Sequence, residues 1–282
     1  MITILLFACT NKESKPQEET VQEQTQADKN LNGFWVGDFV AEETKDGSEF
    51  VTTNKLNIAI KSIINDTVSA QSIVAGNKRP LSGKINRRNG KTTFNLAEPG
   101  DDKYDGTFEF ELVGDSLIGF WKAYNTNLPV TKRSFKLVRK EFSYNPNLML
   151  SSEGDYTDYV DSKSKTELDT LEDGKVEEYT DDYYRQASES VYTLNSSTKL
   201  LTEKELKNLK KLDLEILRNT IFARHGYTFK KKSFRQFFDP VEWYVPVSDN
   251  IDGELTAVEK TNIKLLTRFE KYATDNYDTF GR

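Results

Sequence analysis

The chain has 282 residues, of which 36% are hydrophobic and 12% aromatic, enough for one large domain or two ordinary ones with apolar cores. Its formal net charge of −6 argues against a nucleic-acid partner, because phosphate binding needs a concentrated excess of Lys and Arg. After the N-terminus, no apolar run reaches the roughly 18 residues that a membrane-spanning helix needs.

The N-terminus begins with a short apolar stretch, residues 2–8, that ends at Cys9, the only cysteine in the sequence. A run of this length is typical of the central region of a secretion signal. Leu6-Phe7-Ala8-Cys9 resembles a lipobox, the cleavage signal of bacterial lipoproteins. The resemblance implies cleavage before Cys9, lipidation of that residue and lasting attachment to a membrane. No Lys or Arg precedes the run, which departs from the pattern, so we expect the natural start to lie upstream of Met1.

The residues after Cys9, up to about residue 30, are almost all polar or charged, so they cannot bury enough surface to fold. We therefore expect a lipid anchor at Cys9 followed by a disordered tether. The alternative is a buried free cysteine near a disordered end. If Cys9 is lipidated, no cysteine is left for a disulfide, a thiolate metal site or a nucleophile.

Residues 31–142 show the alternation of apolar and polar side chains that is typical of half-buried strands, as in Leu56, Ile58 and Ile60. Turn dipeptides such as Asn65-Asp66 and Asn89-Gly90 separate the runs and favour tight hairpins. We predict an antiparallel meander of about eight strands, the number that can close into a small barrel. The predicted strands begin near Gly33, Leu56, Thr67, Leu81, Thr92, Thr107, Leu117 and Phe135.

Gly33-Phe34-Trp35, at the start of the first predicted strand, is similar to the Gly-x-Trp signature of lipocalins and related barrels. The resemblance implies that Trp35 packs across one end of the barrel. We expect Trp35 and Trp121 to fill the core together with the many phenylalanines of this region. The alternative is that these side chains line a cavity for a small apolar ligand.

Residues 143–195 form an acidic, tyrosine-rich connecting segment, which we expect to be solvated or only partly ordered. Residues 196–275 then carry helical patterns, and 276–282 form a tail. Capping boxes at Thr202 to Glu205 and at Thr256 to Glu259 predict the starts of two helices. Gly226 is placed to end a third helix in the left-handed conformation. The predicted fold is therefore α+β, with a β-barrel-like domain, the connecting segment and a small all-α domain.

The all-α region contains Leu217-Arg218-Asn219, then Phe222-Ala223-Arg224-His225-Gly226-Tyr227, Trp243-Tyr244 and a closing segment at 259–263. This order resembles the YARHG domain, a small extracytoplasmic helical module of bacterial lipoproteins and envelope proteins. The resemblance covers about 192–272 and implies a non-catalytic role, with no ligand specified. The chain has Phe222 where the family has Tyr, which argues against any chemistry by that hydroxyl.

Two interpretations of the motif remain open. In the first, His225 hydrogen-bonds near a helix C-terminus, and Arg218 and Arg224 brace carbonyls or carboxylates of a later turn. In the second, these side chains form an exposed patch for an anion or a glycan. The candidate residues for either role are Arg218, Asn219, Arg224, His225, Gly226, Tyr227, Trp243 and Tyr244.

The sequence offers little catalytic chemistry. His225 is the only histidine, which excludes zinc sites built on two imidazoles. The sequence contains no nucleophile elbow, phosphate-binding loop or dinucleotide fingerprint, and we expect no metal and no cofactor. We therefore expect a non-enzymatic lipoprotein of the cell envelope, anchored to a bacterial membrane and facing the periplasm or the exterior, that binds peptidoglycan or an envelope protein. The alternatives are a lipocalin-like carrier of a small apolar ligand and a carboxylate-based hydrolase.

Overall fold

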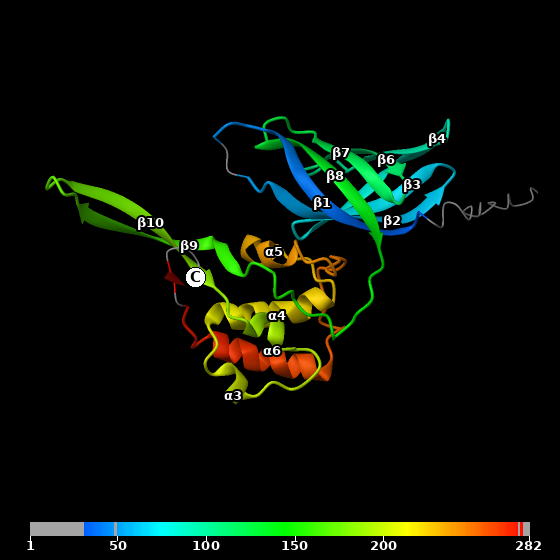
Figure 1. The fold of residues 1–282 in the computed structure, drawn as a ribbon. Helices are drawn as coiled ribbons and strands as arrows, with labels where there is room; N and C mark the ends of the chain where they lie inside the picture. The colour runs from blue at the N-terminus through cyan, green and yellow to red at the C-terminus, as the bar shows by residue number, and fades with distance from the viewer. Residues whose placement is uncertain (1–30, 48–49, 276, 279–282) are drawn as a thin grey trace, which may run out of the picture.

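The computed structural model describes residues 31–47, 50–275 and 277–278, which form a β-barrel, a helical domain and a long projecting hairpin (Figure 1). Cys9, the proposed tether and the end of the tail lie outside the described residues. Within the described part of the chain, no helix is both long and apolar enough to cross a membrane.

The first eight strands form a closed antiparallel barrel in which each strand pairs with the next and β8 returns to β1. This confirms the predicted meander and adds its closure, seen where Gly37 of β1 pairs with Leu137 of β8. The strands are β1 (Gly33–Thr44), β2 (Thr53–Ile64), β3 (Thr67–Val74), β4 (Asn77–Arg88), β5 (Lys91–Ala97), β6 (Gly106–Val113), β7 (Ser116–Ala123) and β8 (Val130–Lys140).

Short hairpins join the strands at one end of the barrel. Asn65-Asp66 and Asn89-Gly90 have positive φ values, the conformation that two-residue hairpin turns need. Trp35 lies near the start of β1 at this end, and its indole N–H donates to the carbonyl of Leu31 at 2.9 Å. Both side chains belong to the barrel core, so this end is filled. Trp121 contributes to the same core from β7.

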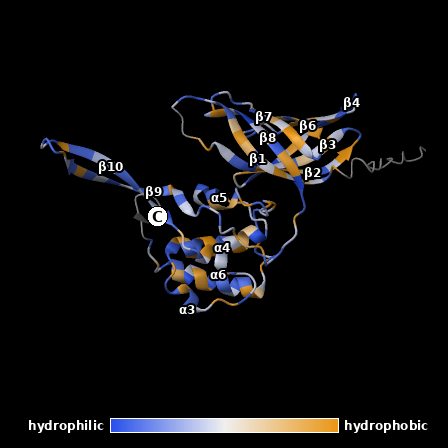
Figure 2. Ribbon diagram, viewed as in Figure 1, coloured by the Kyte–Doolittle hydropathy of each residue, from blue (hydrophilic) through white to orange (hydrophobic). Residues whose placement is uncertain are grey.

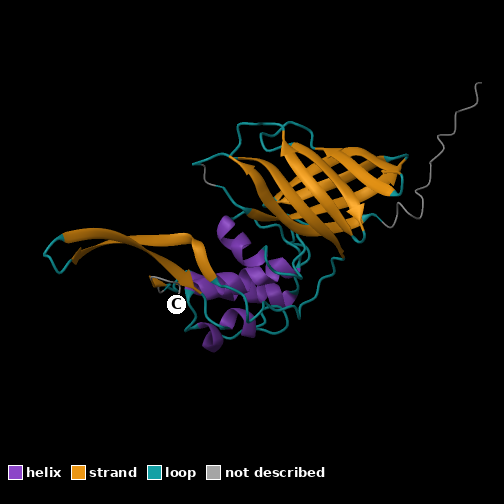
Figure 3. Cartoon of the chain, turned by 45° about the horizontal axis from the view of Figure 1, so that its top comes forward, coloured by secondary structure: helices purple, strands orange, loops and turns teal. Residues whose placement is uncertain are grey.

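The helical domain follows the barrel and has two apolar clusters, whose residues give the helices their mixed colouring in Figure 2. Both predicted capping boxes are present, at the starts of α3 and α6, and the long helices α4 and α6 lie against each other (Figure 3). The helices are α2 (Ser190–Thr193), α3 (Glu203–Leu206), α4 (Lys211–Arg224), α5 (Lys232–Phe238) and α6 (Ala257–Glu270).

The segment that was expected to be solvated or partly ordered contains a hairpin of β9 (Thr157–Thr170) and β10 (Val176–Gln186). The hairpin projects from the helical domain (Figure 1). Most of its side chains are exposed. At its base, Arg185 forms ion pairs with Asp158, Glu215 and Asp275. The two-residue strand β11 (Tyr277–Asp278) pairs with β10 there.

The outer face of β2 is covered by the helical domain. Asn57, fully buried, donates from its side-chain amide to the carbonyl of Pro246 at 2.7 Å. The ammonium of Lys55 donates to the carbonyls of Val241 at 2.7 Å and Tyr244 at 3.3 Å. Because these residues alternate with inward-facing Leu56, both faces of β2 are buried at this point, and the barrel and the helical domain share a polar interface.

Candidate functional site

Helix α4 carries Arg218, Asn219 and Arg224 and is capped by His225. Gly226 follows the cap with φ +70, the left-handed conformation that was predicted for it. The turn is also crowded. A Cβ atom at this position would lie 2.5 Å from Val247 Cγ2 and 2.9 Å from the carbonyl oxygen of Val245. The glycine therefore allows the chain after α4 to pass close to the 245–247 segment.

Arg224 is 1% exposed and lies inside the domain. Its Nε donates to the carbonyl of Leu148 at 2.7 Å, and its Nη1 donates to the Ser197 hydroxyl at 2.9 Å. Burial lowers the pKa of Arg224 to about 10, and attraction by Glu259 and Tyr144 opposes this shift without cancelling it. Arg224 thus fastens the 148–149 segment, which arrives from the barrel, to helix α4.

His225 is also internal. Its Nε2 lies 2.9 Å from Glu259 Oε2, and its ring stacks on Tyr144 with 4.2 Å between the ring centroids. Burial alone would raise the pKa of Glu259, but hydrogen bonds from His225 and from the backbone of Thr256 outweigh it and lower the pKa to about 2. Burial and the neighbouring Glu259 carboxylate raise the pKa of Tyr144 to about 12.

The aromatic members of the motif are held by backbone carbonyls. The Tyr244 hydroxyl, inside the domain, donates to the carbonyl of Tyr227 at 2.6 Å. The Trp243 indole donates to the carbonyl of Met149 at 2.8 Å. Because Arg224, His225 and Tyr244 are buried, the motif does not form one exposed patch. The buried side chains support the first interpretation, in which the motif braces the fold, but Arg224 contacts Leu148 and Ser197, which lie earlier in the chain, and not a later turn.

Three motif residues reach an open groove on the surface of the helical domain. Arg218 and Tyr227 line it and are half-buried, and the buried Asn219, whose side-chain amide donates to the Glu215 carbonyl at 2.7 Å within α4, lines it as well. Arg218 is held in place by Glu270, with 2.6 Å between Nε and Oε1. The groove has a volume of about 540 Å³ and is lined by Arg218, Asn219, Phe222, Tyr227, Phe229, Lys230, Lys231, Phe234, Asp249, Asn250, Ile251 and Asp252.

Cationic groups lie close to aromatic rings in this groove. The guanidinium of Arg218 lies 5.9 Å from the centroid of the Phe222 ring, and the Lys231 ammonium lies 5.2 Å from that of Phe234. Lys230 and Lys231 are exposed. Lys230, Lys231 and Phe234 were not among the candidates predicted from the sequence, although their position shortly after the motif could have indicated that they lie near it.

A second hollow lies at the open end of the barrel, where Trp121 forms part of the wall. The Trp121 indole donates to Glu98 Oε2 at 3.3 Å, and the Ser72 hydroxyl donates to Glu98 Oε1 at 2.9 Å. Burial raises the pKa of Glu98, and these hydrogen bonds oppose the rise. Trp35, in contrast, lies in the filled part of the barrel.

The described residues contain no group of three or more His, Cys, Asp or Glu that is arranged to hold a metal ion. Residues 189–271 match the family model of the YARHG domain, which confirms the resemblance seen in the motif order. No curated protein and no solved structure matches the chain.

Proposed function

We propose that the chain is a lipid-anchored, non-catalytic binding protein of the bacterial cell envelope, and that its YARHG domain at residues 189–271 binds peptidoglycan. One observation carries this proposal: three motif residues, Arg218, Asn219 and Tyr227, line a single groove together with aromatic and charged neighbours. Arg224, His225 and Tyr244 are buried and brace the domain that carries the groove, whereas Trp243 is half-buried elsewhere on its surface.

The chemistry of the groove suits this polymer. Phe222, Tyr227 and Phe234 offer ring faces to the apolar faces of sugars. Lys230 and Lys231 offer cations for the carboxylates of the stem peptides, and the exposed Asp252 at the same groove offers an anion for their free amino groups. Peptidoglycan carries both kinds of charge beside its sugars, so one groove can contact all three features.

The expected lipid anchor supports the same location. Lipidation of Cys9 would hold the protein at a membrane, and the polar residues up to about residue 30 would let the folded domains reach away from it. Both features lie outside the described residues, so this part of the proposal depends on the sequence alone.

Co-sedimentation with purified peptidoglycan sacculi tests the binding site. We expect the wild-type protein to sediment with the sacculi and the double variant Lys230→Glu, Lys231→Glu to bind about tenfold more weakly, a loss of about 1.4 kcal/mol. Lys204→Glu, Lys207→Glu is the matched control, because it makes the same charge change at exposed positions on and after α3. Equal binding by all three proteins, or no binding by any, would contradict the proposal.

An envelope protein is the alternative occupant of the groove, and a carrier role for the barrel is the alternative function. The carrier role is favoured by a separate observation, the hollow at the open end of the barrel. A carboxylate-based hydrolase is the third candidate, and its test is turnover that a single Asp or Glu substitution abolishes. We propose a non-enzymatic role because the only histidine is committed to Glu259 inside the domain.

A further inference from the structure

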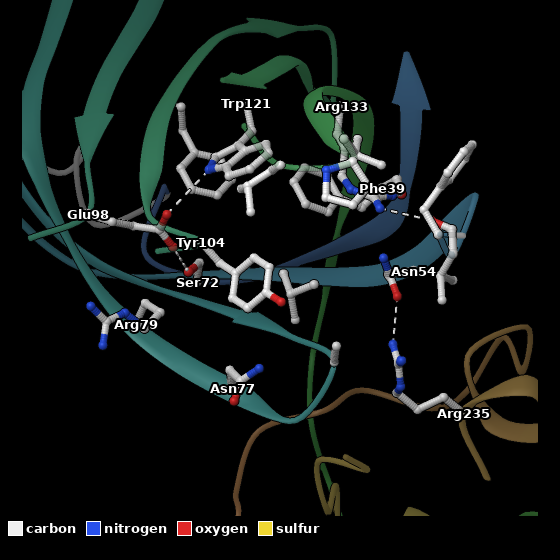
Figure 4. Close-up of a pocket in the computed structure, with 18 residues that line it drawn as sticks. Phe39, Asn54, Ser72, Asn77, Arg79, Glu98, Tyr104, Trp121, Arg133 and Arg235 are labelled. Carbon is white, nitrogen blue, oxygen red and sulfur yellow. Dashed lines mark hydrogen bonds between the residues drawn. The ribbon is translucent and has the colours of Figure 1, made fainter. Parts of the chain in front are cut away.

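The open end of the barrel contains a cavity of about 420 Å³, which the loops at this end and helix α5 surround (Figure 4). Its wall is largely apolar and includes Phe39, Phe108, Trp121 and Leu128. A cavity of this size falls within the roughly 300–1,000 Å³ that small-molecule sites in proteins occupy. The expectation that side chains fill the barrel therefore holds at the end near Trp35 and not at this one.

Arg133 brings a buried positive charge to the cavity. It is 8% exposed, and its guanidinium donates to the backbone carbonyls of Phe39 and Thr52, each at 3.1 Å, and of Val51 at 2.8 Å. Within the described ranges it forms no ion pair. Burial, helped by repulsion from Arg235, lowers the pKa of Arg133 to about 10. A buried cation whose partners are all neutral leaves room for an anion.

Arg235 brings a second guanidinium from the other domain. Helix α5 holds it at the cavity, where its Nη1 donates to Asn54 Oδ1 at 2.6 Å. Its Nε–H is buried and has no hydrogen-bond partner among the residues that the structure describes. Asp239, which lines a neighbouring hollow, is the acidic group that attracts Arg235. An orphaned charged donor beside Arg133 is the sort of group that a bound anion satisfies.

The other charged groups of the cavity are already engaged. Glu98 lies on the opposite side of the cavity from Arg133 (Figure 4), where Ser72 and Trp121 donate to it. Arg79 is paired with Asp105, with 2.7 Å between Nη2 and Oδ2. The cavity therefore combines an apolar wall with an excess of positive charge on the side that faces α5.

We propose that this cavity binds a medium-chain alkyl carboxylate, whose apolar chain lies along Phe39, Phe108 and Trp121 and whose carboxylate accepts hydrogen bonds from Arg133 and Arg235. Since Arg235 belongs to the helical domain and Arg133 to the barrel, the ligand joins the two domains. This site goes beyond the proposed function and uses none of the residues that line the peptidoglycan groove.

Isothermal titration calorimetry of the purified protein tests the site with three probes of equal chain length: decanoate, decanol and decyltrimethylammonium. We expect decanoate to bind one to one and about tenfold or more tightly than either other probe, because only the anion pairs with both guanidinium groups. Absence of decanoate binding overturns the proposal, and so does equal affinity for decanol. The comparison of probes needs no variant and stays decisive whichever variants fold.

The variant Arg235→Gln then tests whether Arg235 binds the carboxylate of the ligand. This residue is half-buried on α5, so its replacement disturbs folding less than replacement of the buried Arg133. We expect decanoate to bind about tenfold more weakly and decanol to be unaffected. Arg88→Gln, exposed at the other end of the barrel, is the matched control and leaves binding unchanged. Unaltered decanoate affinity in Arg235→Gln overturns the assignment.

Discussion

His225 Nε2 lies 2.9 Å from Glu259 Oε2, and both side chains are buried. His225 caps the C-terminus of α4, whereas Glu259 forms the capping box of α6 by accepting from the backbone N–H of Thr256 at 2.9 Å. One contact thus joins the end of one long helix to the start of the other, and Tyr144, which follows the barrel, donates to the same carboxylate at 3.0 Å. The most distinctive residue of the motif is a structural junction.

The first prediction concerns acid stability. Because the folded-state pKa of Glu259 is lowered from 4.5 to about 2, its contribution to stability is present in full above pH 4.5 and is lost as the pH falls towards 2. Glu259→Gln should cost about 3–5 kcal/mol at pH 7, the usual cost of breaking a buried pair. The variant should also show a weaker dependence of the free energy of unfolding on pH between pH 4.5 and pH 2. Urea denaturation from pH 7 to pH 3 measures both effects, and an unchanged acid limb in the variant would contradict the role given to Glu259.

The second prediction concerns Gly226. Gly226→Ala should destabilise the protein by about 2–5 kcal/mol, because it adds left-handed strain and steric overlap with the 245–247 segment. Gly90→Ala has the same strain and open space around it, so it should cost only about 1–2 kcal/mol. Gly253→Ala has neither problem and should stay within about 0.5 kcal/mol of the wild type. Thermal denaturation ranks the three variants by their loss of stability. A loss in Gly226→Ala as small as that in Gly253→Ala would show that the turn at Gly226 is not crowded.

The third prediction concerns the interface between the domains. Lys55→Met leaves two carbonyls, those of Val241 and Tyr244, without a buried donor, so docking should weaken by about 1–3 kcal/mol. Burial lowers the pKa of Lys55 from 10.5 to about 8. The charged form of Lys55 is therefore disfavoured in the docked state. The free-energy cost of burying this charge applies in full below pH 8 and disappears as the pH rises to 10.5.

Denaturant unfolding of wild type and Lys55→Met at pH 7.5 and pH 9.5 checks this interface. The wild type should gain stability relative to the variant at the higher pH, since other groups titrate equally in both proteins. Lys61→Met is the control, because Lys61 lies on the same strand but is exposed. A variant that unfolds like the wild type at both pH values would rule out the anchoring role of Lys55.

The fourth prediction concerns the anchor. In bacterial cells that express the full precursor, Cys9→Ala should move the protein from the membrane fraction to the soluble fraction, because its acyl chains supply the membrane affinity. Membrane fractions washed with high salt and probed with an antibody measure this. The Lys204→Glu, Lys207→Glu protein should stay with the membrane. Retention of the Cys9→Ala protein after the wash would disprove lipid anchoring at this residue.

Much of the fold could be predicted from local patterns. The alternation around Leu56 and Ile58 and the Asn89-Gly90 dipeptide indicate strands and turns because burial and backbone conformation act over a few residues. The capping box at Thr256 likewise marks a helix start directly. The turn at Ala75-Gly76 was missed, since alanine with φ 50 is not a residue that favours this conformation.

The interface and the groove could not be predicted in the same way. Asn57 has the pattern of a solvent-facing residue, yet it is fully buried because a segment 189 residues further along the chain covers it. Arg224, which is charged, is 1% exposed for the same reason. Long-range contacts of this kind leave no periodic signal in a single sequence. The division of the motif into internal residues and residues that line the groove therefore required the structure.

Site-specific photocrosslinking in living cells tests the central claim, that the groove of the YARHG domain contacts the cell envelope. A photoreactive amino acid would replace Lys231 at the groove or, as the control, Lys207 after α3, both exposed. We predict that irradiation links the protein to peptidoglycan from position 231 and not from position 207. Capture of an envelope protein from position 231 would keep the groove but replace its ligand. Equal capture from both positions, or none from position 231, would contradict the account.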